Sequence, residues 1–284
     1  MTLSPRDHRA EMARHTLAIV AAGVYVDETG QRVEIGEAVA ACVRATRLFM
    51  PDDVVALPPP ASSGPTSVAV RNESTLTALS RLVSEGHRRV GVLNFASAKH
   101  PGGGFLRGDP PQEEALARSS ALYESLVSPA ARAFYVRSGE DATNLYTDRV
   151  ILSPDCPVFR DAEGRLLTQP CPATFLTCAA PKTVELRVHE PDLLPLLADT
   201  FARRAARVLA VAAHAGCDAL VLGAWGCGVF GNDPELVAGA FARLLREGGD
   251  FAQRFARVEF AVLDSSDDTA RLRAFERAFG RQSH

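Results

Sequence analysis

The chain has 284 residues, 46% of them hydrophobic and 23% charged, with 31 Lys and Arg against 34 Asp and Glu. This composition excludes a wholly disordered or collagen-like chain. A net charge of −3 argues against a protein that holds duplex nucleic acid on a broad basic face. The six cysteines are irregularly spaced and form no CxxC pair, so we expect neither a zinc site nor a disulfide framework. The apolar stretch near the N-terminus is too short and too charged to span a bilayer, and acidic Asp7 and Glu11 leave it only a weak resemblance to a signal peptide. We therefore expect a cytoplasmic protein with no membrane partner.

The first third of the chain predicts helices that precede a proline-rich loop. Ala, Leu and Val recur at helical spacing over residues 6–22 and 37–49, and a short strand is expected over residues 32–35. Residues 52–65 contain three consecutive prolines and a Ser-Ser-Gly run, which predict a loop or a join.

Strands and helices alternate in the rest of the chain. The predicted strands cover residues 67–70, 90–96, 149–153, 174–179, 219–224 and 258–263. The predicted helices cover residues 74–85, 112–127, 199–215, 234–247 and 269–279. Continuous apolar strands between amphipathic helices indicate an α/β domain whose sheet is covered on both faces. We expect an N-terminal helical extension over residues 1–58, a main domain over residues 59–284, and an irregular excursion over residues 154–172.

One segment joins a buried strand, a glycine-rich loop and an acidic helix start. Its residues of interest are Asn94 at the strand end, Gly102, Gly103 and Gly104 in the loop, and Gln112, Glu113 and Glu114 at the helix start. Successive glycines allow positive φ and a close approach of backbone N–H groups to anionic oxygens. Asp109 is expected to cap the helix, with Pro110 or Pro111 at its first position.

The Glu113–Glu114 pair has two interpretations. Acidic residues in a first helical turn stabilise the helix dipole, which for a pair taken alone is the simpler explanation. Next to a glycine loop, one carboxylate can orient a ligand while the other transfers protons. Two carboxylates in a closed pocket resist ionising together, which raises one pKa, whereas the helix dipole favours the charged form.

The sequence GGG, the seven-residue spacer FLRGDPP and QEE together resemble the signature of poly(ADP-ribose) glycohydrolases. The flanking HPGGGF and QEEALARSSALYESL are similar to the bacterial-type branch of that family. The resemblance extends over about residues 67–263. It implies a macrodomain-like fold, with a mixed sheet between helices that binds ADP-ribose.

The resemblance also implies roles for single residues. It makes Glu114 the catalytic acid/base and Glu113 the carboxylate that bonds ribose hydroxyls. It places Asn94 at the distal ribose, and it has Gln112 support the loop. The three glycines Gly102, Gly103 and Gly104 would line the ribose and diphosphate, while Ser97 receives no firm role.

A second glycine-rich loop follows the apolar strand at residues 219–224. Its GCGVFG is similar to the diphosphate-binding loop of macrodomains, which would involve Gly226, Gly228, Val229, Phe230 and Gly231. Backbone amides beside a helix N-terminus form an anion site, although a tight strand-to-helix turn also needs glycine. Within this loop, Trp225 is expected to pack in the core. Cys227 has no histidine partner in the sequence for nucleophilic catalysis.

Earlier in the chain, Ser74 or Asn72 is expected to cap the helix over residues 74–85.

The implied reaction is hydrolysis of ribose–ribose O-glycosidic bonds in poly(ADP-ribose), with release of ADP-ribose. The reaction implies neither a metal nor a cofactor. Its implied partners are poly(ADP-ribose) and poly(ADP-ribosyl)ated proteins. The implied role is reversal of ADP-ribosylation in the DNA damage response. An ADP-ribose-binding module or a mono(ADP-ribosyl) hydrolase of the same fold is the alternative. A nucleotide-dependent oxidoreductase is disfavoured because GxGxxG is absent.

Overall fold

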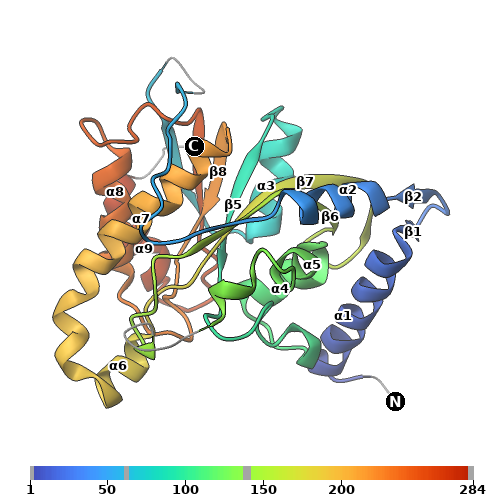
Figure 1. Cartoon of the computed structure of the whole chain (residues 1–284), viewed down its shortest axis with the longest axis horizontal. Helices are drawn as coiled ribbons and strands as arrows, with labels where there is room; N and C mark the ends of the chain where they lie inside the picture. Colours follow the sequence, from blue (N-terminus) through green and yellow to red (C-terminus); the bar gives the residue numbers. More distant parts are fainter. Residues whose placement is uncertain (1–2, 61–63, 137–141, 281–284) are drawn as a thin grey trace.

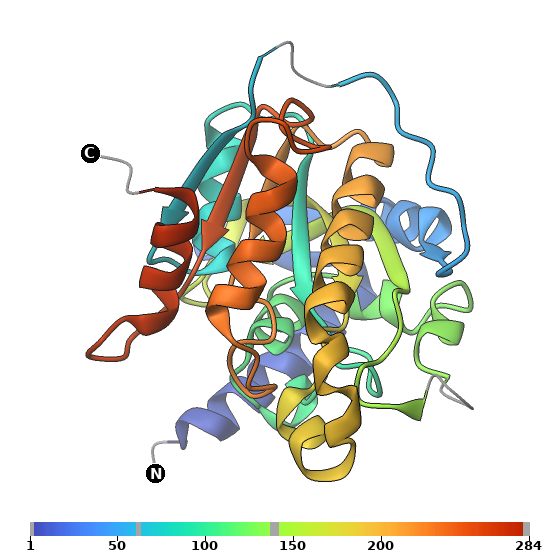
Figure 2. The same ribbon diagram turned by 90° about the vertical axis from the view of Figure 1, so that its left-hand side faces the viewer.

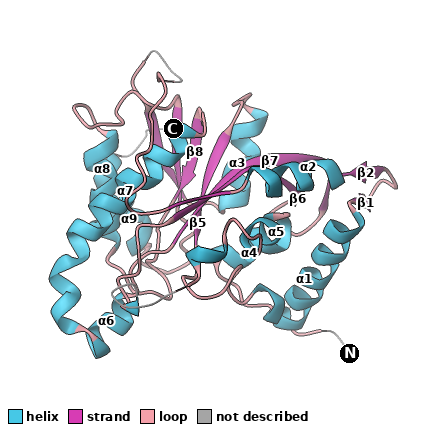
Figure 3. Ribbon diagram, in the orientation of Figure 1, coloured by secondary structure: helices cyan, strands magenta, loops and turns pink. Residues whose placement is uncertain are grey.

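The computed structural model describes residues 3–60, 64–136 and 142–280. Within these residues a seven-stranded sheet has the strand order β3-β6-β7-β5-β8-β9-β4, and β1 and β2 form a separate small sheet. The strands are β1 (Val24–Val26), β2 (Arg32–Glu34), β3 (Arg47–Phe49), β4 (Ser67–Arg71), β5 (Val90–Phe95), β6 (Val150–Arg160), β7 (Leu166–Cys178), β8 (Ala219–Leu222) and β9 (Arg257–Ala261). Figure 3 shows the β1–β2 pair at the periphery, away from the central sheet.

Along the chain the helices alternate with these strands, and in space they lie around the sheet (Figure 1). The α-helices are α1 (Pro5–Ala22), α2 (Gly36–Ala45), α3 (Thr75–Ser84), α4 (Gln112–Ser119), α5 (Leu122–Leu126), α6 (Thr183–His189), α7 (Leu197–His214), α8 (Pro234–Leu245) and α9 (Ala270–Phe279). The 3₁₀ helices are η1 (Phe105–Arg107), η2 (Arg132–Phe134) and η4 (Pro191–Leu196). Across the described part of the chain, every helix is too short or too polar to cross a membrane.

The central sheet separates two hydrophobic cores. Neighbouring side chains of β5 point to opposite faces, so Val92 joins the core under α1 to α5 while Leu93 joins the core under α7, α8 and α9. Figure 2 shows α7, α8 and α9 in front of the sheet. Strands β7, β5, β8, β9 and β4 are parallel, and the β3–β6 and β6–β7 pairs are antiparallel. The predicted mixed α/β sheet, covered on both faces, is confirmed.

The predicted excursion over residues 154–172 is wrong, because most of it belongs to the long β6–β7 hairpin. Its prolines suggested a loop, since proline cannot donate a ladder hydrogen bond. The hairpin accommodates them beside two shifts of register, and Pro157 lies opposite Pro172. Such irregularities bend a strand and leave places where an unpaired backbone is tolerated.

Two predicted helices are shorter than expected. The helix predicted over residues 37–49 ends at Ala45 as α2, and Arg47–Phe49 then pairs with β6 as strand β3. The predicted helix over residues 112–127 is split into α4 and α5, because Ser120 is extended and forms a bridge with Val158. Both interruptions follow from pairing with the distant β6, which short-range periodicity does not report. The strand β1 was also not predicted.

Residues before 58 contribute to the central structure. Strand β3 pairs with β6 in the main sheet, and α1 contacts both η1 and α4. We keep the division at residue 58 as a prediction, with the addition that one strand of the sheet comes from the N-terminal side of it.

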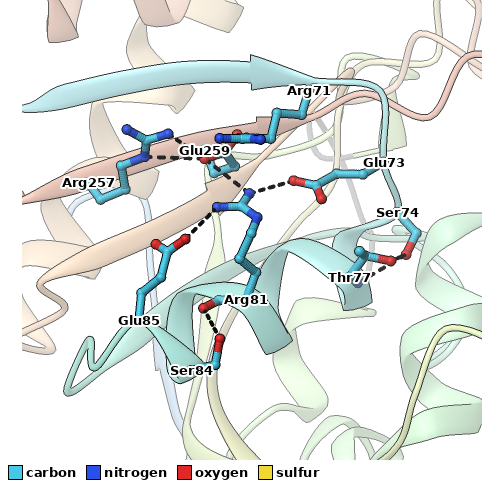
Figure 4. Close-up of polar contacts among 9 residues, drawn as sticks. All are labelled: Arg71, Glu73, Ser74, Thr77, Arg81, Ser84, Glu85, Arg257 and Glu259. Atoms are coloured by element: carbon cyan, nitrogen blue, oxygen red, sulfur yellow. Dashed lines mark hydrogen bonds and ion pairs between the residues drawn. The ribbon is translucent and has the colours of Figure 1, made fainter. Parts of the chain in front are cut away.

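A group of six charged side chains joins α3 to the β4–β9 edge of the sheet (Figure 4). At its centre is Glu259, which is fully buried. The guanidinium groups of Arg71, Arg81 and Arg257 lie 3.1, 3.2 and 2.9 Å from its carboxylate oxygens. Arg81 also reaches Glu73 and Glu85, which balances the charge of the group. Burying a carboxylate is costly unless it is paired, so this network ties α3 to β9.

Candidate active site

Both glycine-rich loops leave the same edge of the sheet. Strands β5 and β8 are parallel neighbours, with Val92 opposite Val221. The chain after Asn94 and the chain after Leu222 therefore emerge side by side at the carboxyl ends of their strands. In Figure 2, β5 points down toward the loops and short helices at the lower end of the molecule. In layered α/β folds this edge is where ligands bind.

The first loop needs glycine at two of its three glycine positions. Gly102 and Gly103 have φ values of 67° and 59°, in the left-handed region that other residues rarely adopt. The loop then turns through η1 and returns to α4. A Cβ atom on Gly103 would lie 2.9 Å from Cδ of Glu114 and 3.2 Å from Oε2 of Glu113. The backbone of Gly103 therefore packs directly against both carboxylates.

Glu113 is held inside the protein, with 2% of its surface exposed. Its Oε2 accepts a 2.6 Å hydrogen bond from the Ser97 N–H, and its Oε1 accepts a 3.4 Å bond from Nδ2 of Asn94. Burial raises the pKa of Glu113 to about 8, and the negative charge of Glu114 adds to this, whereas the bonds from Ser97 and Asn94 act in the opposite direction. Desolvation thus outweighs the hydrogen bonds, and the raised pKa falls on the first glutamate of the pair.

Glu114 lies next to it with 8% of its surface exposed. Its Oε1 accepts a 2.9 Å hydrogen bond from the N–H of Gly104. This bond closes the loop onto the helix that carries the glutamates. Arg118, one helical turn later and 5% exposed, interacts electrostatically with Glu114. A carboxylate beside a backbone donor and a cation has the surroundings that proton-transfer chemistry uses.

Gln112 binds the end of β5. Its Oε1 accepts from the Phe95 N–H at 2.9 Å, and its Nε2 donates to the Leu93 carbonyl at 2.8 Å. The Gln112 side chain thus satisfies backbone groups at the end of β5 and fixes α4 against this strand. The predicted cap of α4 is wrong: Pro111 occupies the cap position without a side-chain bond, and Asp109 instead forms ion pairs with Arg6 and Arg107.

Asn94 is fully buried at the end of β5. Its Nδ2 also donates a 3.1 Å hydrogen bond to Oγ1 of Thr177 on β7. Its Oδ1 has no hydrogen-bond partner among the described residues. The side chain therefore links two strands to Glu113.

The second loop is closed by Asn232, which is 4% exposed. Its Nδ2 donates to the carbonyls of Pro181 and Gly226 at 2.8 and 3.0 Å, and its Oδ1 accepts from Thr183 at 2.6 Å. Gly226 and Gly231 have φ values of 72° and 68°, so both need glycine. Asp233 caps α8 by accepting from the Glu235 N–H, with Pro234 at the first position.

The other residues of the second loop differ in exposure. Val229 is 70% exposed, while Phe230 lies beside Tyr146 with ring centroids 6.2 Å apart. Gly228 has open space around the position of a Cβ atom. The prediction that Trp225 packs in the core is confirmed, because it is fully buried and donates to the Cys178 carbonyl. Burial raises the pKa of Cys227 to about 12, which suppresses the nucleophilic thiolate.

Several residues that organise the site were not predicted. Ser97, Arg118 and Asn232 act through a backbone N–H, a buried guanidinium and a loop-closing amide, as described above. Tyr135 has a buried hydroxyl with no hydrogen-bond partner among the described residues, and it interacts electrostatically with Glu113. For Arg118 the sequence did contain a signal, namely its spacing of four residues from Glu114 on one helix face.

Ser74 caps α3 by accepting from the Thr77 N–H, as expected.

The described residues contain no group of three or more His, Cys, Asp or Glu side chains placed to hold a metal ion. The site contains two carboxyl groups, backbone N–H donors and a nearby arginine. These are groups that bind an anionic ligand and move protons.

Comparison with known proteins identifies relatives of the whole arrangement. The family model described as "Microbial-type PARG, catalytic domain" matches residues 13–161, which include the glycine loop and both glutamates. A poly(ADP-ribose) glycohydrolase from Thermomonospora curvata has a TM-score of 0.90 and 45% identity, over 96% of this chain and 100% of that chain. The same enzyme bound to the inhibitor ADP-HPD has a TM-score of 0.88 and 46% identity, over the same shares of the two chains.

A second organism provides a further relative. Poly(ADP-ribose) glycohydrolase from Deinococcus radiodurans in complex with ADP-ribose has a TM-score of 0.78 and 42% identity, over 85% of this chain and 97% of that chain. No match was found among curated protein sequences. The fold is macrodomain-like, as the resemblance implied. Family model and solved structures agree, and the chain belongs to the microbial-type poly(ADP-ribose) glycohydrolases.

Proposed function

We propose that this protein hydrolyses the ribose–ribose O-glycosidic bonds of poly(ADP-ribose) and releases ADP-ribose. The observation that carries the proposal is the pair of buried glutamates packed against Gly103, with Glu114 bonded to the Gly104 N–H. A glycosidic bond is broken when a carboxylic acid protonates the leaving oxygen, and the carboxylate that remains can then accept a proton from the attacking water. The family membership and the relatives bound to ADP-ribose and ADP-HPD support the same substrate class.

In the proposed mechanism Glu114 is the acid/base. It donates a proton to the leaving ribose oxygen as the bond from that oxygen to the anomeric carbon breaks and an oxocarbenium-like centre develops. Water then attacks the anomeric carbon, and its proton returns to Glu114. The Gly104 N–H stabilises the carboxylate that remains after the first transfer. No proton or electron is left over at the end of the cycle.

Glu113 is proposed to bind ribose hydroxyls of the unit that is cleaved. Burial raises the pKa of Glu113 to about 8, which favours its protonated carboxyl group at neutral pH. Asn94 and the Ser97 N–H position this carboxyl group. Gln112 holds α4 against β5, so that both glutamates face the loop.

The two loops are proposed to bind the rest of ADP-ribose. Backbone N–H groups of the first loop (Gly102, Gly103 and Gly104) would approach the ribose and diphosphate. Those of the second (Gly226, Gly228, Val229, Phe230 and Gly231) would bind the diphosphate, with Phe230 against a ribose. Glycine-rich loops at the carboxyl ends of strands suit anionic oxygens because their N–H groups are accessible.

The physiological substrates are proposed to be poly(ADP-ribosyl)ated proteins, and the role to be reversal of this modification in the DNA damage response. A cytoplasmic location is proposed with it. The irregular spacing of the six cysteines, with no CxxC pair, fits a reducing compartment.

The test is a time course with automodified poly(ADP-ribose), comparing the wild type with Glu114→Gln. Glu247→Gln, at an exposed turn position just after α8, is the matched control. We expect free ADP-ribose from the wild type and from Glu247→Gln, and a loss of about 10²-fold or more in Glu114→Gln, with ADP-ribose affinity within a few-fold. Polymer that survives while ADP-ribose still binds would make the protein a reader. Activity on singly modified protein alone would make it a mono(ADP-ribosyl) hydrolase.

A further inference from the structure

The spacer between the glycine loop and the glutamates is bound by arginines at three successive carbonyl groups. Nε of Arg6 donates to the carbonyl of Arg107 at 3.0 Å. Nε of Arg9 donates to the next carbonyl, that of Gly108, at 2.7 Å. Nη1 of Arg118 donates to the following one, that of Asp109, at 2.7 Å. We call these three arginines (Arg6, Arg9 and Arg118) the arginine clamp.

Two of the three clamp residues come from α1, about 100 residues before the loop in sequence. The helix approaches the loop closely. A Cβ atom on Gly108 would lie 3.0 Å from the N atom of Ala10 and closer still to the carbonyl oxygen of Arg6. Gly108 also has a φ of 75°. The spacer can therefore pass under α1 only with glycine at this position.

The contacts continue from α1 to the proposed acid/base. Asp109 lies against Gly104, since a Cβ atom on Gly104 would be 2.6 Å from Cγ of Asp109. Gly104 in turn donates its N–H to Glu114. A displacement of the spacer therefore moves the donor that Glu114 uses.

From these contacts we propose that Arg9 is a positioning residue of the active site, which holds the spacer so that the Gly104 N–H meets Glu114. The proposal rests on the function proposed above. Arg9 is half-buried and contributes the shorter of the two bonds from α1. A full charge on the donor makes such bonds to carbonyls stronger than neutral ones. The N-terminal helix would thus belong to the catalytic apparatus as well as to the packing.

Replacing Arg9 alone should leave α1 in place, because other residues anchor it. Ala13, which is fully buried, packs with Phe105 and Ala117. Thr16 donates to the carbonyl of Arg118, and Ile19 and Val20 belong to the main core. The effect of the variant can therefore be measured on folded protein.

The experiment compares Arg9→Ala, Arg9→Lys and the control Arg14→Ala in the full chain. Arg14 lies on α1, is exposed and, among the described residues, forms no hydrogen bond or ion pair with residues 102–109. For each variant we would measure kcat on poly(ADP-ribose), the Kd of ADP-ribose, the Tm, and backbone hydrogen exchange over residues 102–109. We expect Arg9→Ala to lose about tenfold or more in kcat with Kd within about threefold, because misplacement by about 1 Å costs up to 10²-fold.

Lysine should recover part of the rate, since its ammonium can donate to the same carbonyl, and Arg14→Ala should match the wild type. Faster exchange over residues 102–109 in Arg9→Ala alone would show that Arg9 holds the loop. A lower Tm with kcat unchanged would give Arg9 a merely structural role and overturn the proposal. If the wild type releases no ADP-ribose, the proposed function fails. Hydrogen exchange then tests the role of Arg9 by itself: if exchange over residues 102–109 is the same in Arg9→Ala and Arg14→Ala, Arg9 does not hold the loop and the proposal is rejected.

Discussion

The N–H of Gly104 donates a 2.9 Å hydrogen bond to Oε1 of Glu114, ten residues later in the chain. This bond joins the last glycine of the first loop to the second glutamate of the helix start. It means that loop and helix form one unit, in which the backbone of the loop sets the surroundings of the carboxylate. The proposed acid/base therefore depends on the shape of the loop as much as on its own side chain.

The first prediction concerns Gly103→Ala. The new Cβ atom would clash with the carboxylate of Glu114, and the φ of 59° is unfavourable for alanine. We expect a loss of about 10²-fold in kcat and a destabilisation of about 1–3 kcal/mol. The measurements are initial rates on poly(ADP-ribose) and urea unfolding.

Its control is Gly239→Ala, at a glycine of α8 with open space around the position of the Cβ atom. Alanine in a helix interior should keep the rate and add up to about 1 kcal/mol of stability. A Gly103→Ala variant with the kcat of this control would contradict the proposed packing of loop against carboxylate.

The second prediction concerns the pH dependence of stability. Glu113 has a pKa of about 8 in the folded protein and 4.5 as its ordinary value. Between these values the folded protein keeps a proton that the unfolded chain has released, so the free energy of unfolding falls as pH rises. The slope from this group is up to about 1.4 kcal/mol per pH unit.

Replacement by a neutral side chain removes this contribution. Between pH 4.5 and pH 8, the two ends of this window, we expect the free energy of unfolding to fall less for Glu113→Gln than for the wild type. Urea unfolding at both values measures it, with Glu247→Gln as the exposed control. If Glu113→Gln and the wild type lose the same free energy over this window, Glu113 is ionised throughout it.

The third prediction concerns Glu259, the buried centre of the ion network in Figure 4. In Glu259→Gln the guanidinium groups of Arg71, Arg81 and Arg257 lose their shared carboxylate. Breaking a buried ion pair from one side costs about 3–5 kcal/mol, and we expect about 3 kcal/mol because the three arginines are partly exposed. The m-value of urea unfolding should not change.

The comparison variant is Glu37→Gln, which removes the ion pair of Glu37 with Arg44 at an 85% exposed side chain. Exposed pairs contribute little, so its effect should stay below about 1 kcal/mol. Equal stability of the two variants would mean that the network at Glu259 does not hold α3 to the sheet.

Short-range patterns identified most elements of the fold. Helices α1, α3, α7, α8 and α9 follow from apolar spacing, and the cap at Ser74 follows from residue type. The parallel core strands follow from continuous apolar runs. The errors at β3, at the break in α4–α5 and in the hairpin of β6 and β7 all involve pairing with β6. Two further errors are local: strand β1, which pairs with β2, was missed, and Asp109 does not cap α4. A pattern within a few residues contains no information on which other segment those residues pair with.

The same division holds for the active site. The sequence by itself determined the glycine loop, the glutamate pair and, through its resemblance, the family and the substrate class. The tertiary structure alone decided that Glu113 bears the raised pKa, since that depends on how completely the fold excludes water from its carboxyl group. It also brought Arg9 to Gly108 and Gly104 to Glu114. Residue types and local spacing determine which groups are present, while burial and hydrogen bonding between distant segments determine their protonation and orientation.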